Sequence, residues 1–335
     1  MKFFSALSFL SLALVFAVQA CESPRYRCSD FKTAQQVIDA YRAGATYLDG
    51  NGDGYACEKT WNVYVLKGKK HKPPARARSK QQAISSSGSS TLSAPASSQV
   101  QLTMGNPSQA GIRPDNYLLL KPQYALSYNA SKGIPNWVSW QLNQSWLGPV
   151  DRQNDFRPDD TLPSNFYHVL PSDYSGSGYD RGHQTPSGDR TLNKEDNSAT
   201  FLMSNMIPQT PDLNRGPWQK LESYSRQLVS EGKELYTIAG VTGQKGTFAE
   251  GKISIPARNW KVVVVLEKPG LGLAGVTANT RVIAVDMPNE EGLKEKDWTE
   301  YRTTVKQIEA ATGYNLLSNV PDKIQQVIES KVDSP

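Results

Sequence analysis

A polar stretch from Asn62 to Ser98 divides the chain and limits how it can fold. It begins with a basic run over Lys67–Lys80, and it ends in Ser85–Ser98, which consists almost entirely of small residues. Neither part has enough apolar surface to offset the entropy lost on ordering, so we predict a disordered linker over residues 62–98. The chain should therefore fold as a small unit, residues 21–61, and a large unit, residues 99–335.

The first twenty residues have the composition of a secretory signal peptide. Lys2 supplies a positive charge, residues 3–18 are mostly apolar, and Ala20 is a small residue at the expected cleavage site. We therefore predict residues 1–20 as a signal peptide and a secreted or periplasmic, envelope-facing protein. Two alternatives stay open for Cys21, which follows the cleavage site: lipid attachment or an unmodified thiol. The basic run is either a solvated tether or a salt-sensitive contact with phosphates or the envelope.

The small unit contains a loop of oxygen-bearing side chains that suits Ca²⁺. Carboxylates and one amide alternate with glycine after Leu48, and such alternation can aim several oxygens at one centre. A plain turn rich in Gly and Asp is the alternative. The predicted calcium ligands are the side chains of Asp49, Asn51, Asp53 and Glu58 and the backbone carbonyl of Tyr55.

Cys28 and Cys57 lie near the two ends of this small unit, and export favours their oxidation to a disulfide. Residues 31–43 between them have the apolar spacing of a short helix. Together with the loop, these features resemble the Excalibur calcium-binding domain of exported bacterial proteins. A zinc site made from the three cysteines and His71 is an alternative, although their spacing fits no common zinc pattern.

The large unit mixes strand-like and helix-like segments and contains no cysteine. We predict an α+β fold, with a central sheet flanked by helices. The predicted strands are residues 117–120, 124–129, 137–141, 234–241, 252–255, 260–267 and 280–286, and the predicted closing helices are residues 298–312 and 322–332.

Polar residues able to cleave a phosphodiester are concentrated between Tyr179 and Glu222. A metal-assisted phosphodiesterase needs a base for water, an oxygen ligand for a hard cation and cations for phosphate. The chain has only three histidines and a net charge of +5, which suits a polyanionic substrate. The candidate site residues are Asp180, Arg181, His183, Asn205, Asn214 and Glu222, together with Arg152 from an earlier polar loop.

The spacing between Asn214 and Glu222 predicts different roles for the two residues. If a helix opens at Asn214 and continues through Leu228, Glu222 lies about 12 Å further along its axis. That separation is too large for direct coordination of one ion by both side chains. It suits a carboxylate that holds a metal-bound water.

From about Leu102 onward the chain resembles the DNA/RNA non-specific endonucleases, in particular the sugar-non-specific nucleases that cyanobacteria secrete. The segments SGSGYDRGH, TFLMSNMIPQTP, ANTRVIAV and SNV carry this resemblance. It implies the ββα-metal fold and one catalytic Mg²⁺ or Mn²⁺. The implied roles are His183 as general base, Asn214 as direct metal ligand, Glu222 as holder of metal-bound water, Arg152 as the cation that neutralises transition-state charge, Arg181 as phosphate partner and Asn205 as a supporting residue, with Asp180 of the DRGH segment at the same site.

The resemblance implies hydrolysis of DNA and RNA, single- or double-stranded, to 5′-phosphorylated products. Because the nucleophile is water and not a ribose 2′-OH, this chemistry does not require RNA. The resemblance also allows a protein inhibitor as a partner, and envelope association through Cys21 or the basic run is an alternative localisation. Two rival functions are a calcium-dependent envelope protein that binds nucleic acid with little turnover and a purely structural calcium-binding module.

Overall fold

The computed structural model describes residues 27–30, 36–37, 40, 48, 55–57, 63–64 and 98–334. The chain divides into two compact units, residues 1–74 and 75–335. The predicted signal peptide and Cys21 lie outside the described residues. Within the described part, no helix has the length and apolar character needed to cross a membrane.

A disulfide between Cys28 and Cys57 holds the small unit together, as predicted. Strand β1 (Tyr55–Ala56) pairs antiparallel with β2 (Val63–Tyr64). Strand β2 lies at the start of residues 62–98, the range predicted as a linker. Residues 36, 37 and 40 are helical, in agreement with the predicted helix. Of the predicted calcium ligands, Tyr55 belongs to β1, whereas Asp49, Asn51, Asp53 and Glu58 lie outside the described residues.

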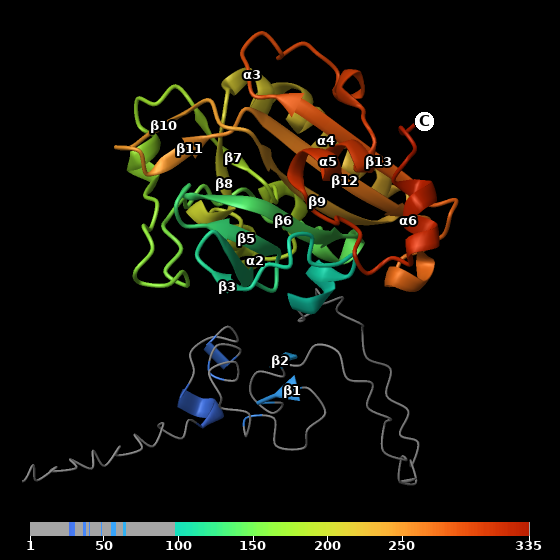
Figure 1. The fold of residues 1–335 in the computed structure, drawn as a ribbon, viewed down its shortest axis with the longest axis horizontal. Helices are drawn as coiled ribbons and strands as arrows, with labels where there is room; N and C mark the ends of the chain where they lie inside the picture. Colours follow the sequence, from blue (N-terminus) through green and yellow to red (C-terminus); the bar gives the residue numbers. More distant parts are fainter. Residues whose placement is uncertain are drawn as a thin grey trace, which may run out of the picture. The chain divides into compact units, whose positions relative to one another are not determined.

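The large unit is built on a seven-stranded antiparallel sheet with the strand order β13-β12-β9-β6-β5-β4-β3 (Figure 1). Alternating apolar residues and a run of valines in β12 explain why these segments form strands with both faces covered. All the predicted strands are present. The strands of this sheet are β3 (Ile112–Arg113), β4 (Asn116–Leu120), β5 (Ala125–Asn129), β6 (Ile134–Leu142), β9 (Glu234–Thr242), β12 (Arg258–Leu266) and β13 (Arg281–Pro288).

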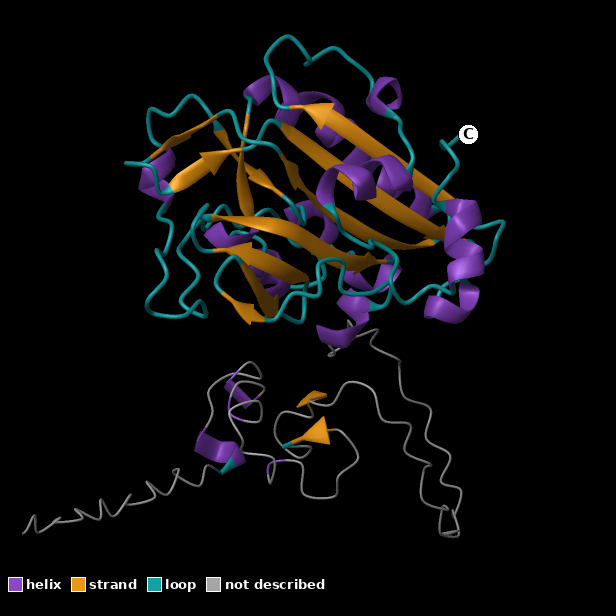
Figure 2. Ribbon diagram, viewed as in Figure 1, coloured by secondary structure: helices purple, strands orange, loops and turns teal. Residues whose placement is uncertain are grey.

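Helices cover both faces of this sheet, which gives the predicted α+β architecture (Figure 2). On one face α4 (Gln219–Ser230) packs Leu221 and Leu228 against Val263 and other buried side chains of the sheet. On the other face lie α5 (Val305–Thr312) and α6 (Asp322–Ile328). A short helix, α2 (Lys194–Ala199), precedes strand β8 (Met206–Gln209) in the chain.

The prediction of one continuous helix over residues 298–312 is wrong. A 3₁₀ turn covers Trp298–Tyr301, and α5 starts only at Val305, with Thr304 as its N-cap. Arg302 interrupts the helix because it forms a β-bridge with Val285 in the sheet. The last predicted helix also ends earlier than expected, at Ile328 and not at Val332.

A two-stranded ribbon and α4 form a ββα unit on one face of the sheet. The ribbon pairs β7 (Asp180–His183) with β8 (Met206–Gln209), with His183 opposite Met206. The chain then enters α3 (Pro211–Leu213), a π-helical turn and α4. A second hairpin, β10 (Gly246–Phe248) with β11 (Ile253–Ile255), lies near this ribbon (Figure 1).

Candidate active site

Strand β7 places its four residues alternately on two sides of the ribbon. In a strand successive side chains point to opposite faces, so Arg181 and His183 share one face and Asp180 takes the other. Gly182 is required by close packing, since a Cβ there would lie 2.0 Å from the side-chain oxygen of Gln209. The glycine therefore makes room for the side chain of Gln209.

Two phenyl rings hold the imidazole of His183. The rings of Phe156 and Phe201 contact it edge-to-face, with centroids 5.7 Å and 5.0 Å away. The same rings carry the two predicted arginines, because the Arg181 guanidinium lies 4.1 Å from the Phe156 centroid and that of Arg152 lies 4.8 Å from the Phe201 centroid. The phenyl pair therefore holds one imidazole and two guanidinium groups side by side.

His183 is uncharged in this environment at neutral pH. Its side chain is buried, and burial together with the positive charges of Arg152 and Arg181 lowers its pKa to about 3. Nε2 has no hydrogen-bond partner among the described residues. A neutral imidazole with an unengaged nitrogen is the form that can accept a proton.

Asp180 orients the amide of Asn214. Its Oδ2 accepts a hydrogen bond of 2.9 Å from Asn214 Nδ2, and both of its oxygens accept bonds from Arg215 at 2.9 and 2.7 Å. Because a carboxylate can only accept, the amide nitrogen must face Asp180, and the amide oxygen is the atom left for a ligand. Asp180 does not itself line the pocket.

The helix does not open at Asn214, so this prediction is wrong. It starts at Pro211, capped by the side chain of Thr210, and passes through a π-helical turn over Asn214–Trp218 before α4 begins. Gly216 has φ −114° and ψ −118° inside this turn, so the axis is broken between Asn214 and Glu222. The expected separation along an unbroken helix therefore does not apply.

Glu222 is a mostly buried carboxylate on α4. Its side chain is 13% exposed, and the ammonium of Lys261 lies 3.8 Å from its Oε1. Burial raises the pKa of Glu222, and the positive charges of Lys261, Arg226 and Arg152 oppose this rise. The carboxylate thus sits in a shielded and positively charged setting.

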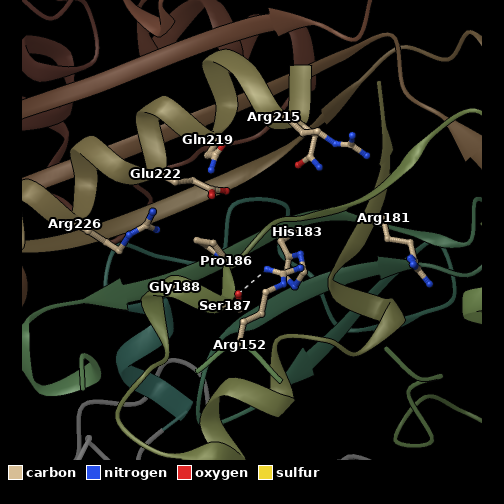
Figure 3. A pocket seen from close by; sticks show the side chains of 11 residues that line it. Arg152, Arg181, His183, Pro186, Ser187, Gly188, Arg215, Gln219, Glu222 and Arg226 are labelled. Atoms are coloured by element: carbon tan, nitrogen blue, oxygen red, sulfur yellow. Dashed lines mark hydrogen bonds between the residues drawn. The ribbon is translucent and has the colours of Figure 1, made fainter. Parts of the chain in front are cut away.

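A cavity of ≈ 330 Å³ brings together most of the predicted site residues (Figure 3). Gln219, Glu222 and Arg226 project from α4 on one side, and His183 and Arg152 lie opposite them. Four arginines and one carboxylate give the wall a positive balance. The lining residues are Arg152, Arg181, His183, Pro186, Ser187, Gly188, Asn214, Arg215, Gln219, Glu222 and Arg226.

Asn205 lies behind the pocket and not on its wall. Its side chain is fully buried, and it exchanges hydrogen bonds with Thr185 and donates to the backbone of Thr200. It therefore locks the chain that follows His183. Arg157, a second arginine close to Arg152 in the sequence, pairs with Asp155 at 2.9 Å and does not line the pocket.

Sequence reasoning missed several residues of this site. Phe156 and Phe201 gave a weak signal, because each lies close in sequence to a predicted site residue. Lys261 gave a clearer signal, because it is a charged residue in a mostly apolar strand. By strand alternation it points to the same face as Val263 and Val265. The lining residues that were not predicted are Pro186, Ser187, Gly188, Arg215, Gln219 and Arg226.

The pocket donors fit a small, strongly hydrated divalent cation. The amide oxygen of Asn214 and the carboxylate of Glu222 are hard oxygen groups that line the pocket together with the amide of Gln219. Mg²⁺ keeps several waters and needs only one or two such groups. The part of the chain that the structure describes contains no group of three or more His, Cys, Asp or Glu side chains able to cage a metal. This donor set is therefore suited to an ion that retains most of its water.

Comparison with known proteins identifies the class of this fold and site. Residues 106–323 match the DNA/RNA non-specific endonuclease family, and residues 25–58 match the Excalibur calcium-binding domain. A solved structure of an EndoG/EndoGI complex superposes with a TM-score of 0.57 at 23% identity, covering 68% of this chain and 94% of that one. The antiparallel sheet with helices on both faces is thus a nuclease fold.

Sequence relatives agree with this class. A nuclease of Nostoc sp. is 59% identical over 238 residues, which cover 70% of this chain and 86% of that protein. The mouse mitochondrial Nuclease EXOG is 29% identical over 204 residues, which cover 57% of this chain and 54% of that protein. The chain belongs to the DNA/RNA non-specific endonuclease family, carries an N-terminal Excalibur domain, and is a nuclease.

Proposed function

We propose that the protein is a sugar-non-specific endonuclease that hydrolyses DNA and RNA with one Mg²⁺ or Mn²⁺ ion and His183 as general base. The observation that carries this proposal is a single cationic pocket lined by both His183 and Asn214. A base and a hard-metal ligand that line one cavity are what hydrolysis of a phosphodiester needs. A protein that only binds nucleic acid would not require that pair.

His183 takes a proton from the attacking water. Its lowered pKa keeps the imidazole neutral before substrate binds, so no proton has to leave first. A bound phosphodiester brings negative charge beside Arg152 and Arg181, and this offsets the positive field that makes His183 a weak base. Proton transfer to His183 is then easier in the complex than in the free protein.

The arginines bind and orient the scissile phosphate. The Arg152 guanidinium donates from Nη1 to Ser187 Oγ at 2.8 Å and from Nε to Asn154 Oδ1 at 2.7 Å, which fixes its plane at the pocket wall. Arg181 is held on Phe156. Preoriented cations stabilise the charge that develops on the phosphoryl oxygens with little reorganisation.

Asn214 would hold the ion directly, and Glu222 would hold it through water. When bound, Mg²⁺ or Mn²⁺ supplies Lewis-acid stabilisation of the phosphate and of the leaving oxygen. Because the nucleophile is water and not a ribose 2′-OH, the chemistry does not require RNA, and both deoxyribose and ribose substrates are accepted. The products are 5′-phosphorylated.

The test is incubation of the purified protein with plasmid DNA and with RNA, with EDTA or with added Mg²⁺. Both substrates should be cut only when the metal is present. Direct labelling of product 5′ ends by a polynucleotide kinase should fail until a phosphatase has removed the terminal phosphate. Tight binding of plasmid without cleavage in Mg²⁺ or Mn²⁺ would instead favour the nucleic-acid-binding rival.

We also propose that the protein is exported and that its N-terminal domain holds Ca²⁺ through Asp49, Asn51, Asp53, Tyr55 and Glu58. The disulfide is consistent with an oxidising compartment. Mass measurement of the mature N-terminus tests cleavage after Ala20 and lipid attachment at Cys21. Calorimetry tests calcium binding.

A further inference from the structure

Lys261 is a buried cation directly behind the pocket. It stands on strand β12, between β13 and β9 in the sheet, and its side chain is 2% exposed. Its Nζ lies 4.0 Å from the ring centroid of Trp218 and 5.8 Å from that of Trp140. Lysine on a strand usually faces water, but α4 covers this face of the sheet. An ammonium is retained in such a place only when neighbouring groups compensate for lost hydration.

The compensating anion is Glu222. Its Oε1 lies 3.8 Å from Lys261 Nζ, and this is the sole salt bridge of Glu222 among the described residues. The lysine approaches from the sheet, whereas Glu222 comes from α4 and lines the pocket, which Lys261 does not. Lys261 thus contacts the carboxylate without itself lining the cavity.

The two indoles that enclose Lys261 also reach the rest of the site. Trp218 donates from Nε1 to the backbone oxygen of His183 at 3.3 Å. Trp140 donates from Nε1 to Asp189 at 3.0 Å, and Asp189 in turn accepts from Arg226 at 3.0 Å. Lys261 is therefore the centre of a buried cluster that contacts both walls of the cavity.

We propose that Lys261 is a positioning residue for the nuclease reaction, whose ammonium, held between Trp218 and Trp140, fixes the carboxylate of Glu222 at the pocket wall. The proposal rests on the role proposed for Glu222. Lys261 does not touch substrate or the ion, and it acts only through the orientation of Glu222. Its removal should weaken the hold on the ion without altering the surface that binds nucleic acid.

A double-mutant cycle of Lys261→Met and Glu222→Gln tests this inference. Methionine is apolar and of similar length, so it can fill the space between the indoles. Lys261→Met should lower kcat by about 10- to 100-fold and raise the half-saturating Mg²⁺ concentration, as loss of an outer-shell partner of a metal ligand does. KM for DNA should change by less than about twofold. In the Glu222→Gln background, Lys261→Met should cause no further loss.

A matched control is Lys121→Met, which removes another buried lysine, paired with Asp159 at 3.0 Å away from the pocket. It should lower the thermal midpoint and leave kcat per folded molecule unchanged. If Lys261→Met does not fold, Lys261→Gln provides the same test, because it keeps the polar tip and removes the charge.

Multiplicative losses in the double variant, or an unchanged Mg²⁺ requirement in the folded Lys261 variant, would overturn the positioning role and leave the proposed function intact. Full activity of Glu222→Gln alone is a different result. It would remove the role of Glu222 in the proposed function, and the inference about Lys261 with it.

Discussion

Replacement of Asp180 by alanine should weaken metal binding more than it weakens catalysis at saturating metal. Asp180 is the group that turns the nitrogen of the Asn214 amide away from the ion site. Without it the carboxamide can rotate, and its NH₂ group then competes with its oxygen for the position that faces the cavity. A carboxamide nitrogen is not a ligand for Mg²⁺.

The structure separates two contributions of Asp180. Its ion pair with Arg215 joins side chains that are 18% and 64% exposed, so it contributes only about 0–1 kcal/mol. Its hydrogen bond to Asn214 has an ionised acceptor and is worth about 1.5–3 kcal/mol. That energy corresponds to a bias of at least about tenfold toward the oxygen-out orientation of the amide.

The assay is the initial rate of plasmid cleavage as a function of Mg²⁺ concentration at constant ionic strength. For Asp180→Ala the half-saturating concentration should rise by about 10-fold or more, within the range seen for outer-shell partners. Arg215→Ala is the matched control, because it breaks the ion pair and keeps the bond to Asn214. Its Mg²⁺ requirement should stay near that of the wild type, with any change appearing in KM for DNA. An unchanged Mg²⁺ requirement in folded Asp180→Ala would refute the reasoning.

Four other outcomes are expected. His183→Ala should lower kcat by at least about 10²-fold, the usual share of a positioned base, and near-normal turnover by the folded variant would eliminate His183 as that base. Burial and two guanidinium groups lower the pKa of His183 to about 3. The acidic limb of the profile of kcat/KM against pH should therefore lie well below about 6.5, the pKa of an ordinary histidine. An acidic limb near that value would contradict the assignment of His183 as the general base. Burial and then Glu309 raise the pKa of Glu329 to about 7, so its neutral form stabilises the fold at low pH and this stabilisation is lost as pH rises through about 7. After allowance for solvent screening, Glu329→Gln should have a free energy of unfolding about 1 kcal/mol above that of the wild type near pH 8 but not near pH 4. Urea unfolding at both pH values measures this difference, and equal responses of the two proteins would contradict it. Asp53→Ala should weaken Ca²⁺ binding in calorimetry and spare Mg²⁺-driven cleavage, whereas Asn214→Ala should do the reverse; loss of cleavage by Asp53→Ala in saturating Mg²⁺ would show that the two domains are coupled.

The break between Trp298 and Thr312 illustrates where local patterns stop being sufficient. The residues have a helical pattern, yet Arg302 forms a bridge with Val285 and donates from Nη1 to the backbone oxygen of Asp333. Both partners are distant in sequence. A local pattern reports how a segment would behave alone, and it does not include an alternative partner supplied by the sheet.

The sequence by itself determined the strands of the central sheet other than β3, the pairing of Cys28 with Cys57 and the family. Side-chain alternation and β-branched runs are local properties of a strand, and the DRGH and SNMIPQ segments are local motifs, so both are readable without coordinates. The same holds for the mixture of a base, amide oxygens and cations between Tyr179 and Glu222.

Only the tertiary structure decided how these residues are held. It showed that Asp180 orients Asn214, that Phe156 and Phe201 support His183, and that Lys261 lies behind Glu222. Each of these contacts joins residues from separate elements. Burial then shifts the pKa of the lysine or histidine side chain from its ordinary value. Burial and long-range pairing depend on how the ribbon and α4 pack on the sheet, and that packing is not contained in the spacing of any one segment.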